Sequence, residues 1–290
     1  MQVEIAWKKR RKWHIRVQLQ PAPAVISTPM VEPLSYTGLI DVHSHVLWGL
    51  DDGSASIEES LAMLRSASEH GTAVIVATPH SNAEYSYQQE LIEARILELI
   101  AHSGGNPRLL RGCDFHLSFD NIDVLLDQPS KYTINGKQYL LVECPDSSVG
   151  RHTESVFNRL LDARIVPIVT HPERNPILQQ KLSRVEAWVE QGCLVQVTAL
   201  SITGGFGRSA KSAARKLLAR GLVHIVASDA HDPANRHPRL DEAYAVVQSL
   251  YGQDAAEFLF YENPHAVVEG LSLPGGKQVL TQSARSWWPF

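Results

Sequence analysis

The sequence predicts an α/β fold in which parallel strands alternate with helices. Short apolar, β-branched segments recur along the chain, and each is followed by polar residues and then by a segment with helical periodicity. Strands that alternate with helices pair in parallel through right-handed crossovers. About seven such units favour a closed or nearly closed barrel. An open doubly wound sheet is the alternative.

The predicted elements follow one another in a regular order. The strands are expected at Leu39–His43, Ala73–Thr78, Arg108–Cys113, Gln138–Cys144, Ile165–Thr170, Leu194–Thr198 and Val223–Ser228. The helices are expected at Ser56–His70, Ser86–His102, His152–Ala163, Ser183–Gln191, Arg208–Arg220, Leu240–Tyr251 and Asn263–Gly270. Ser56 is a plausible N-cap, with Glu58 and Glu59 in the first turn. The longer connection Leu117–Gly136 is expected to hold a short helix and a hairpin around Ile134–Lys137.

The two ends of the chain differ from the middle. Residues 1–37 contain a basic run and a proline-rich stretch, which predict a poorly ordered extension. Residues 38–273 form the predicted folded domain, and residues 274–290 form a C-terminal tail. The aromatic end of that tail, Trp287 to Phe290, would pack on the domain, pack on a second copy in a homo-oligomer, or remain disordered.

Composition and charge exclude several classes of protein. The net charge of −4 gives no overall electrostatic case for binding nucleic acid or a membrane surface. No apolar run approaches the length of a membrane span, so membrane insertion is not expected. Cys113, Cys144 and Cys193 form no CxxC pair, which predicts a reduced, cytoplasmic protein. None of the three has arginine at the sixth following place, as a cysteine phosphatase requires, so they are interpreted as packing residues.

Histidine and carboxylate side chains follow six of the seven predicted strands. His43 and His45 are two residues apart, so on a strand both imidazoles would point to the same side. The carboxyl ends of parallel strands meet at one rim, where these groups would converge. Nitrogen and oxygen ligands without a thiolate requirement suit Zn, Mn or Fe. At least nine candidate ligands are too many for one ion, so two or three ions with shared carboxylates are expected.

Such a site favours the hydrolysis of phosphate esters. Bound metal ions lower the pKa of a water ligand and stabilise charge on phosphoryl oxygens. Arg174 lies three residues after His171, and Arg236 lies five residues after His231. The planar guanidinium group matches phosphate oxygens. Surface salt bridges are the alternative interpretation of both arginines.

The motifs DVHSH, LDDG, ATPH, HPER and ASDAH, in this order, resemble the PHP metal-dependent phosphoesterases. The chain is most similar to the bacterial protein-tyrosine phosphatases of capsular and exopolysaccharide synthesis, over Leu39 to Leu271. This resemblance implies a distorted (β/α)7 TIM-like barrel that holds two or three divalent ions, with manganese favoured over iron or zinc. By motif, the implied metal ligands are His43, His45, Asp52, His80, Asp114, Glu143, His171, Asp229 and His231.

The resemblance also implies roles for the neighbouring residues. A metal-bridging hydroxide would attack phosphorus in line while Arg174 and Arg236 hold phosphate oxygens. Asp51 and Glu173 are expected to orient imidazoles. The family usually has glutamate where this chain has Asp114, and His116 is the residue that could compensate for the shorter side chain. The implied partner is a phosphotyrosine protein, such as the tail of a bacterial tyrosine kinase.

Other functions stay open on the residues alone. A small-molecule phosphatase acting on a sugar phosphate, histidinol phosphate or nucleotide would use the same rim. Trp48 would shape the pocket for an aromatic leaving group or simply pack. An amidohydrolase also begins with HxH on its first strand, and a metal-dependent docking module would need no catalysis. The glycine-rich stretch Gly204–Gly207 precedes a helix, where it would bind an anion or form a flexible loop.

Overall fold

A computed structural model describes residues 37–117, 121–145, 149–150 and 152–274. The predicted extension and the predicted C-terminal tail lie outside these residues, except for residues 37 and 274. None of the helices in the described part combines the length and apolar composition needed to cross a membrane.

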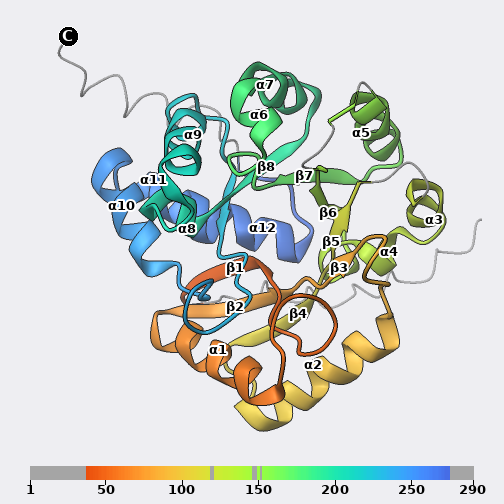
Figure 1. Cartoon of the computed structure of the whole chain (residues 1–290), viewed down its shortest axis with the longest axis vertical. Helices are drawn as coiled ribbons and strands as arrows, with labels where there is room; N and C mark the ends of the chain where they lie inside the picture. The colour runs from red at the N-terminus through yellow and green to blue at the C-terminus, as the bar shows by residue number, and fades with distance from the viewer. Residues whose placement is uncertain (1–36, 118–120, 146–148, 151, 275–290) are drawn as a thin grey trace, which may run out of the picture. The chain divides into compact units, whose positions relative to one another are not determined.

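Within the described residues, the strands form two sheets, and every pair of neighbouring strands is parallel (Figure 1). The first sheet has the order β1 (Leu39–Ser44), β2 (Thr72–Ala77), β4 (Arg108–Arg111). The second has the order β3 (His80–Ser81), β5 (Asp114–His116), β6 (Tyr139–Glu143), β7 (Val166–Thr170), β8 (Leu194–Thr198), β9 (Ile225–Ala227). The prediction of a parallel α/β fold is therefore confirmed.

The boundary between the sheets is a short break in two adjacent strands. Two residues separate β2 from β3, and two residues separate β4 from β5. The amide of Gly112 donates to Ala77 O over 2.9 Å, and that of Asp114 donates to Pro79 O over 3.2 Å. At the other side, Asp229 N donates to His43 O and His45 N donates to Ala230 O, each over 2.8 Å. The outer strands of the two sheets, β1 and β9, therefore lie next to each other.

The helices lie around the strands in Figure 1. The longer ones are α1 (Ile57–Glu69), α2 (Gln89–Ser103), α5 (His152–Asp162), α7 (Leu182–Gln191), α9 (Gly207–Ala219), α10 (Asp241–Tyr251) and α12 (Asn263–Glu269). Short helices occur at α3 (Ile122–Asp127), α4 (Pro129–Tyr132), η1 (Ile134–Gly136), α6 (Pro176–Gln180), α8 (Ala199–Thr203), α11 (Gln253–Glu257) and η2 (Phe258–Glu262). Ser56 accepts a hydrogen bond from Glu59 N over 3.3 Å, which confirms the predicted N-cap.

The hairpin expected around Ile134–Lys137 is not present, and this prediction was wrong. Asn135 and Gly136 do adopt left-handed conformations, with φ of 51° and 65°. The residues before them form helices rather than a strand, and β6 pairs in parallel with β5 and β7. The Arg111 guanidinium group donates to Ser130 O over 3.1 Å, and this tertiary contact holds the helical segment.

Two hydrophobic clusters cover the strands. The larger one includes Met63 of α1, Leu99 of α2 and Trp188 of α7, which pack against strand residues such as Val197. The smaller one joins residues of β1, β2, β4, β6, β7 and β9 to Val267 and Val268 of α12. Apolar side chains thus fill both faces of the sheets, and polar groups are concentrated beyond the carboxyl ends of the strands.

Candidate metal centre

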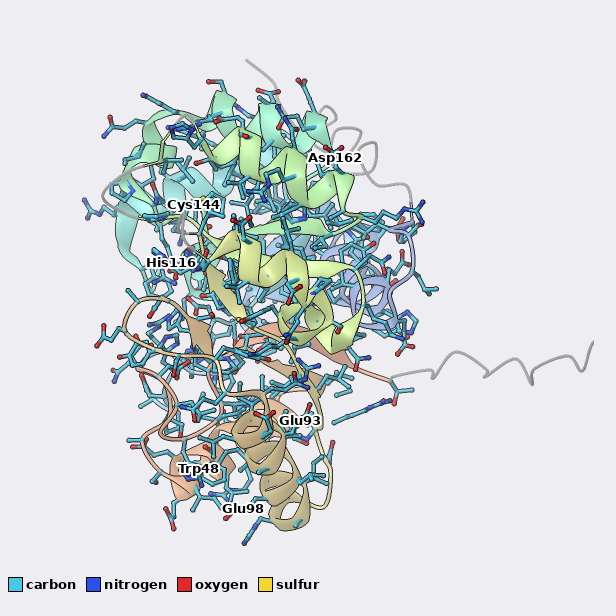
Figure 2. The ribbon with its side chains drawn as sticks, turned by 90° about the vertical axis from the view of Figure 1, so that its right-hand side faces the viewer. Trp48, Glu93, Glu98, His116, Cys144 and Asp162 are labelled. Atoms are coloured by element: carbon cyan, nitrogen blue, oxygen red, sulfur yellow. The ribbon has the colours of Figure 1, made fainter. Side chains whose placement is uncertain are left out.

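The carboxyl ends of the strands point to the same side of the molecule. Figure 2 shows this for three labelled residues: Trp48 after β1, His116 at the end of β5 and Cys144 after β6 all lie toward its left-hand side. Asp162, at the end of α5, lies toward the right. Side chains that follow different strands therefore meet at one rim, as expected for a parallel α/β fold.

The nine residues named above as metal ligands form overlapping groups in which one ligand atom of each member lies within 4.8 Å of the others. The groups are His45, Asp52, His80 and His231; His43, Asp114 and His171; His43, His45 and Asp229; and His80, Asp114 and Glu143. His43, His45, His80 and Asp114 each belong to two of these groups. The shared members make one continuous cluster of imidazoles and carboxylates.

The Asp114 carboxylate has the environment of a metal ligand. It is fully buried, and neither oxygen has a hydrogen-bond partner among the described residues. Its Oδ2 atom lies 3.5 Å from His43 Nε2 and 3.3 Å from His80 Nδ1. Ligand atoms held around one ion by bonds of about 2.1 Å are about 3.4 Å apart in a tetrahedron. Because buried polar atoms are normally paired, these two oxygens fit a bound cation.

Electrostatics also favour positive charge at this position. Burial alone would lower the pKa of His43, but the carboxylates of Asp114 and Asp229 raise it to about 9. Burial likewise acts to lower the pKa of His80, and Asp114 and Asp52 raise it to about 11. Burial, followed by the charge of Asp114, raises the pKa of Glu143 to about 8. The carboxylates thus stabilise positive charge placed among them, and bound divalent ions would supply that charge.

Two histidines of the cluster are oriented by buried hydrogen bonds. His45 Nδ1 lies 2.7 Å from Asp51 Oδ2, and the same oxygen accepts from His80 N over 3.0 Å. His43 Nδ1 lies 3.0 Å from Gln196 Oε1 of β8. The role of Asp51 was predicted from the sequence, and that of Gln196 was not. The available signal was a lone amide side chain inside the apolar strand Leu194–Thr198.

A second buried contact, between Asp41 and Ser228, was likewise not predicted from the sequence. Asp41, in the middle of β1, accepts from Ser228 Oγ over 2.5 Å and from Ser228 N over 3.0 Å. Its carboxylate is fully buried, which raises its pKa to about 6 despite these bonds. The contact fixes the residue before Asp229 against β1. A carboxylate inside an apolar strand was the signal.

Arg174 and Arg236 reach the cluster from different loops. Arg236 Nη2 donates to Asp229 Oδ2 over 2.8 Å, and Arg174 Nη1 donates to the same oxygen. Each arginine side chain retains about a quarter of its exposure, at 26%. Arg236 Nε is buried and has no hydrogen-bond partner among the described residues. The partly exposed side chains of Arg174 and Arg236 are therefore the cationic groups that an anion at the rim would meet.

His171 and Asp229 have backbone conformations that residues other than glycine rarely adopt. Their φ angles are 32° and 51°, in the left-handed region. Strain of this kind persists where the surrounding structure fixes a residue, and it concentrates at functional sites. His171 directly follows β7, Asp229 lies two residues after the end of β9, and both carry candidate ligand atoms.

Two expectations on neighbouring residues, Glu173 and His116, have a different outcome, and Trp48 follows one of its two alternatives. Glu173 is fully buried, but the recorded partners of its carboxylate are Thr198 N and Ser201 Oγ at the start of α8 rather than an imidazole. His116 belongs to none of the candidate ligand groups of the described residues. Trp48 is buried, and the Arg95 guanidinium carbon lies 4.1 Å from its ring centroid, which agrees with the packing alternative for this side chain.

Cys113, Cys144 and Cys193 are free and buried. Burial raises the pKa of the Cys144 and Cys193 thiols to about 12, and that of Cys113 well above its ordinary value. A thiolate is the nucleophilic form, and none of these environments favours it. The buried positions agree with the interpretation of the cysteines as packing residues.

Comparison with known proteins agrees with the resemblance found in the sequence motifs. Residues 39–269 match the family described as "Capsular polysaccharide synthesis, CpsB/CapC". The tyrosine-protein phosphatase CpsB of Streptococcus pneumoniae is 29% identical over 239 residues, which is 79% of this chain and 98% of that protein. The tyrosine-protein phosphatase YwqE of Bacillus subtilis is 28% identical over 245 residues, which is 81% of this chain and 93% of that protein.

A solved structure supports the same relationship. It belongs to a study of YwqE from Bacillus subtilis and CpsB from Streptococcus pneumoniae, described as unique metal-dependent tyrosine phosphatases. The match has a TM-score of 0.77 and 28% sequence identity, and it covers 81% of this chain and 96% of that one. The fold and the sequence thus point to the same set of relatives.

Proposed function

The chain belongs to the CpsB/CapC family of capsular polysaccharide synthesis, and we propose that it is a metal-dependent phosphatase of phosphotyrosine in proteins. The observation that carries this proposal is a buried carboxylate without hydrogen-bond donors beside two partly exposed arginines. The Asp114 oxygens lack donors among the described residues, and the side chains of Arg174 and Arg236 are each 26% exposed where they pair with Asp229. Divalent cations would bind the carboxylate, and the arginines would bind phosphate oxygens.

The metal ligands of this proposal are the nine residues of the clustered groups, and they would hold two or three ions, with manganese favoured. Divalent ions bound there would lower the pKa of a water ligand and stabilise charge on phosphoryl oxygens. Asp51 and Gln196 would keep the imidazoles of His45 and His43 in place.

The two arginines act on the substrate in this proposal. Asp229 holds both guanidinium groups by hydrogen bonds. Their remaining N–H groups would bind phosphate oxygens and stabilise the charge that develops on them. The phenolate leaving group of phosphotyrosine has a pKa of about 10, so its departure requires little help from a general acid.

We also infer the architecture of the whole domain and the protein on which it acts. The two parallel sheets would be parts of one distorted seven-stranded barrel, supported by the hydrogen bonds between β1 and the residues after β9. The folded domain would span residues 38–273. The proposed substrate is the phosphotyrosine tail of a bacterial tyrosine kinase in the cytoplasm, which accords with the capsule-synthesis family.

The proposal is tested by hydrolysis of a phosphotyrosine peptide, a phosphoserine peptide and a panel of metabolite phosphates, with Mn²⁺ and with a chelator. We expect preferential hydrolysis of the phosphotyrosine peptide, lost with the chelator and in His171→Ala. His102→Ala is the matched control, because this histidine is exposed on α2 and is expected to be silent. Activity on metabolites alone would instead assign a small-molecule phosphatase.

A further inference from the structure

One aromatic side chain contacts both arginines at the rim. Phe206 is partly exposed, and its ring centroid lies 4.3 Å from the Arg174 guanidinium carbon and 5.8 Å from that of Arg236. Guanidinium groups are attracted to aromatic faces at such distances. Phe206 therefore lies beside the two groups that would bind phosphate oxygens.

The loop that carries Phe206 is held in place from both sides. Buried Glu173 accepts from Thr198 N and Ser201 Oγ at the start of α8, which leads into the loop. Gly205 N donates to Leu200 O over 2.7 Å, and Lys211 Nζ donates to Thr203 O over 2.8 Å. The position of Phe206 relative to Arg174 is thus set by the fold rather than by a freely moving loop.

The chemistry of the substrate places its ring close to the same point. In phosphotyrosine a single ester oxygen separates phosphorus from the aromatic ring. A ring joined to a phosphate that Arg174 and Arg236 hold would therefore lie within reach of the side chains that pack on these arginines. Trp48 is not available for this contact, because its ring is buried under Arg95.

Resting on the function proposed above, we propose that Phe206 is a specificity-determining residue that contacts the aromatic ring of phosphotyrosine. Its edge or face would meet the substrate ring, an arrangement that stabilises aromatic pairs beyond their area of contact. Phosphoserine and alkyl phosphates present no ring and would gain nothing from this side chain. The same two arginines would serve all phosphates, and Phe206 would separate aryl from alkyl esters.

Binding measurements test this without relying on turnover. Phenylphosphonate and methylphosphonate share the charged group, and only the first carries a ring. We expect calorimetry with the Mn²⁺-loaded full chain to show tighter binding of phenylphosphonate. In Phe206→Ala, and in Phe206→Leu if the alanine variant does not fold, its affinity should fall about fivefold. The affinity for methylphosphonate should change less than about twofold. Phe206→Tyr keeps the ring and should retain both affinities.

Two results would overturn the proposal. Equal losses for both phosphonates would show that Phe206 only positions the arginines. An unchanged preference for phenylphosphonate in Phe206→Ala would place the ring elsewhere. A chain that binds phenylphosphonate through Phe206 but hydrolyses no phosphotyrosine peptide would leave this inference standing and reject the proposed function.

Discussion

Arg236 donates two hydrogen bonds to Asp229: Nη2 donates to the Asp229 carboxylate over 2.8 Å and to its main-chain oxygen over 3.2 Å. This double contact fixes the guanidinium plane at the rim and leaves the buried Nε without a partner among the described residues. A lysine could carry the charge there, but it could not reproduce the planar fork. The geometry of Arg236, as well as its charge, is therefore open to experiment.

We expect Arg236→Ala to lower kcat/KM for a phosphotyrosine peptide about 100-fold, because one fixed donor to the developing charge is lost. Arg236→Lys should recover only part of this loss. Arg239→Ala is the control, since Arg239 pairs with Asp241 away from the cluster and should have less than about a twofold effect. An Arg236→Lys enzyme with full activity would argue against a role for the fork.

Asp114→Asn is expected to reduce metal content, measured by elemental analysis of the purified chain, because a buried negative ligand becomes neutral. Asp114→Glu should not raise metal content, since Oδ2 already lies within 3.5 Å of both His43 Nε2 and His80 Nδ1. The added methylene in a packed site should cost about 1–3 kcal/mol in the free energy of unfolding. A glutamate variant with more metal and equal stability would contradict this view.

Removal of metal should destabilise the fold, because bound ions stabilise only the state in which the ligand groups are assembled. At an ion concentration about 100-fold above the dissociation constant, the difference is about 2.7 kcal/mol. Thermal unfolding with Mn²⁺ and with a chelator measures it. The shift should shrink in His171→Ala and persist in His102→Ala. Identical melting temperatures with and without chelator would indicate that no ion binds the folded chain.

We expect the buried thiol of Cys193 to lower the free energy of unfolding at high pH. Burial raises the pKa of its thiol from 9.0 to about 12, so the folded state keeps the proton while the unfolded state loses it. The contribution is fully present below pH 9 and is lost as pH rises toward 12, by about 1.4 kcal/mol per unit. Denaturant unfolding at pH 8 and pH 10.5 should show a steeper decline in the wild type than in Cys193→Ala. Parallel declines would mean that this thiol is not protected.

The sequence was sufficient to predict the parallel order of strands and helices because each strand carries its own apolar pattern and ends in its own polar residues. The contacts that support the cluster were harder to predict. Gln196 meets His43, and Ser228 meets Asp41, across most of the chain, and no local pattern pairs such residues. The expected hairpin failed for a related reason: Asn135 and Gly136 turn as their residue types favour, but packing decides what flanks them.

The break between the two sheets places Gly112 where its neighbours leave no room for a side chain. A Cβ atom on Gly112 would come within 2.7 Å of Val76 Cγ1 and 3.0 Å of Thr78 Cγ2. Any larger residue would force a shift of Val76, of Thr78 or of the backbone between β4 and β5, and β5 begins with Asp114. A mutation at this site would thus present in the laboratory as a metal-binding defect, although Gly112 offers no side chain to an ion. Surveys of inactive variants that inspect only the liganding residues would overlook it.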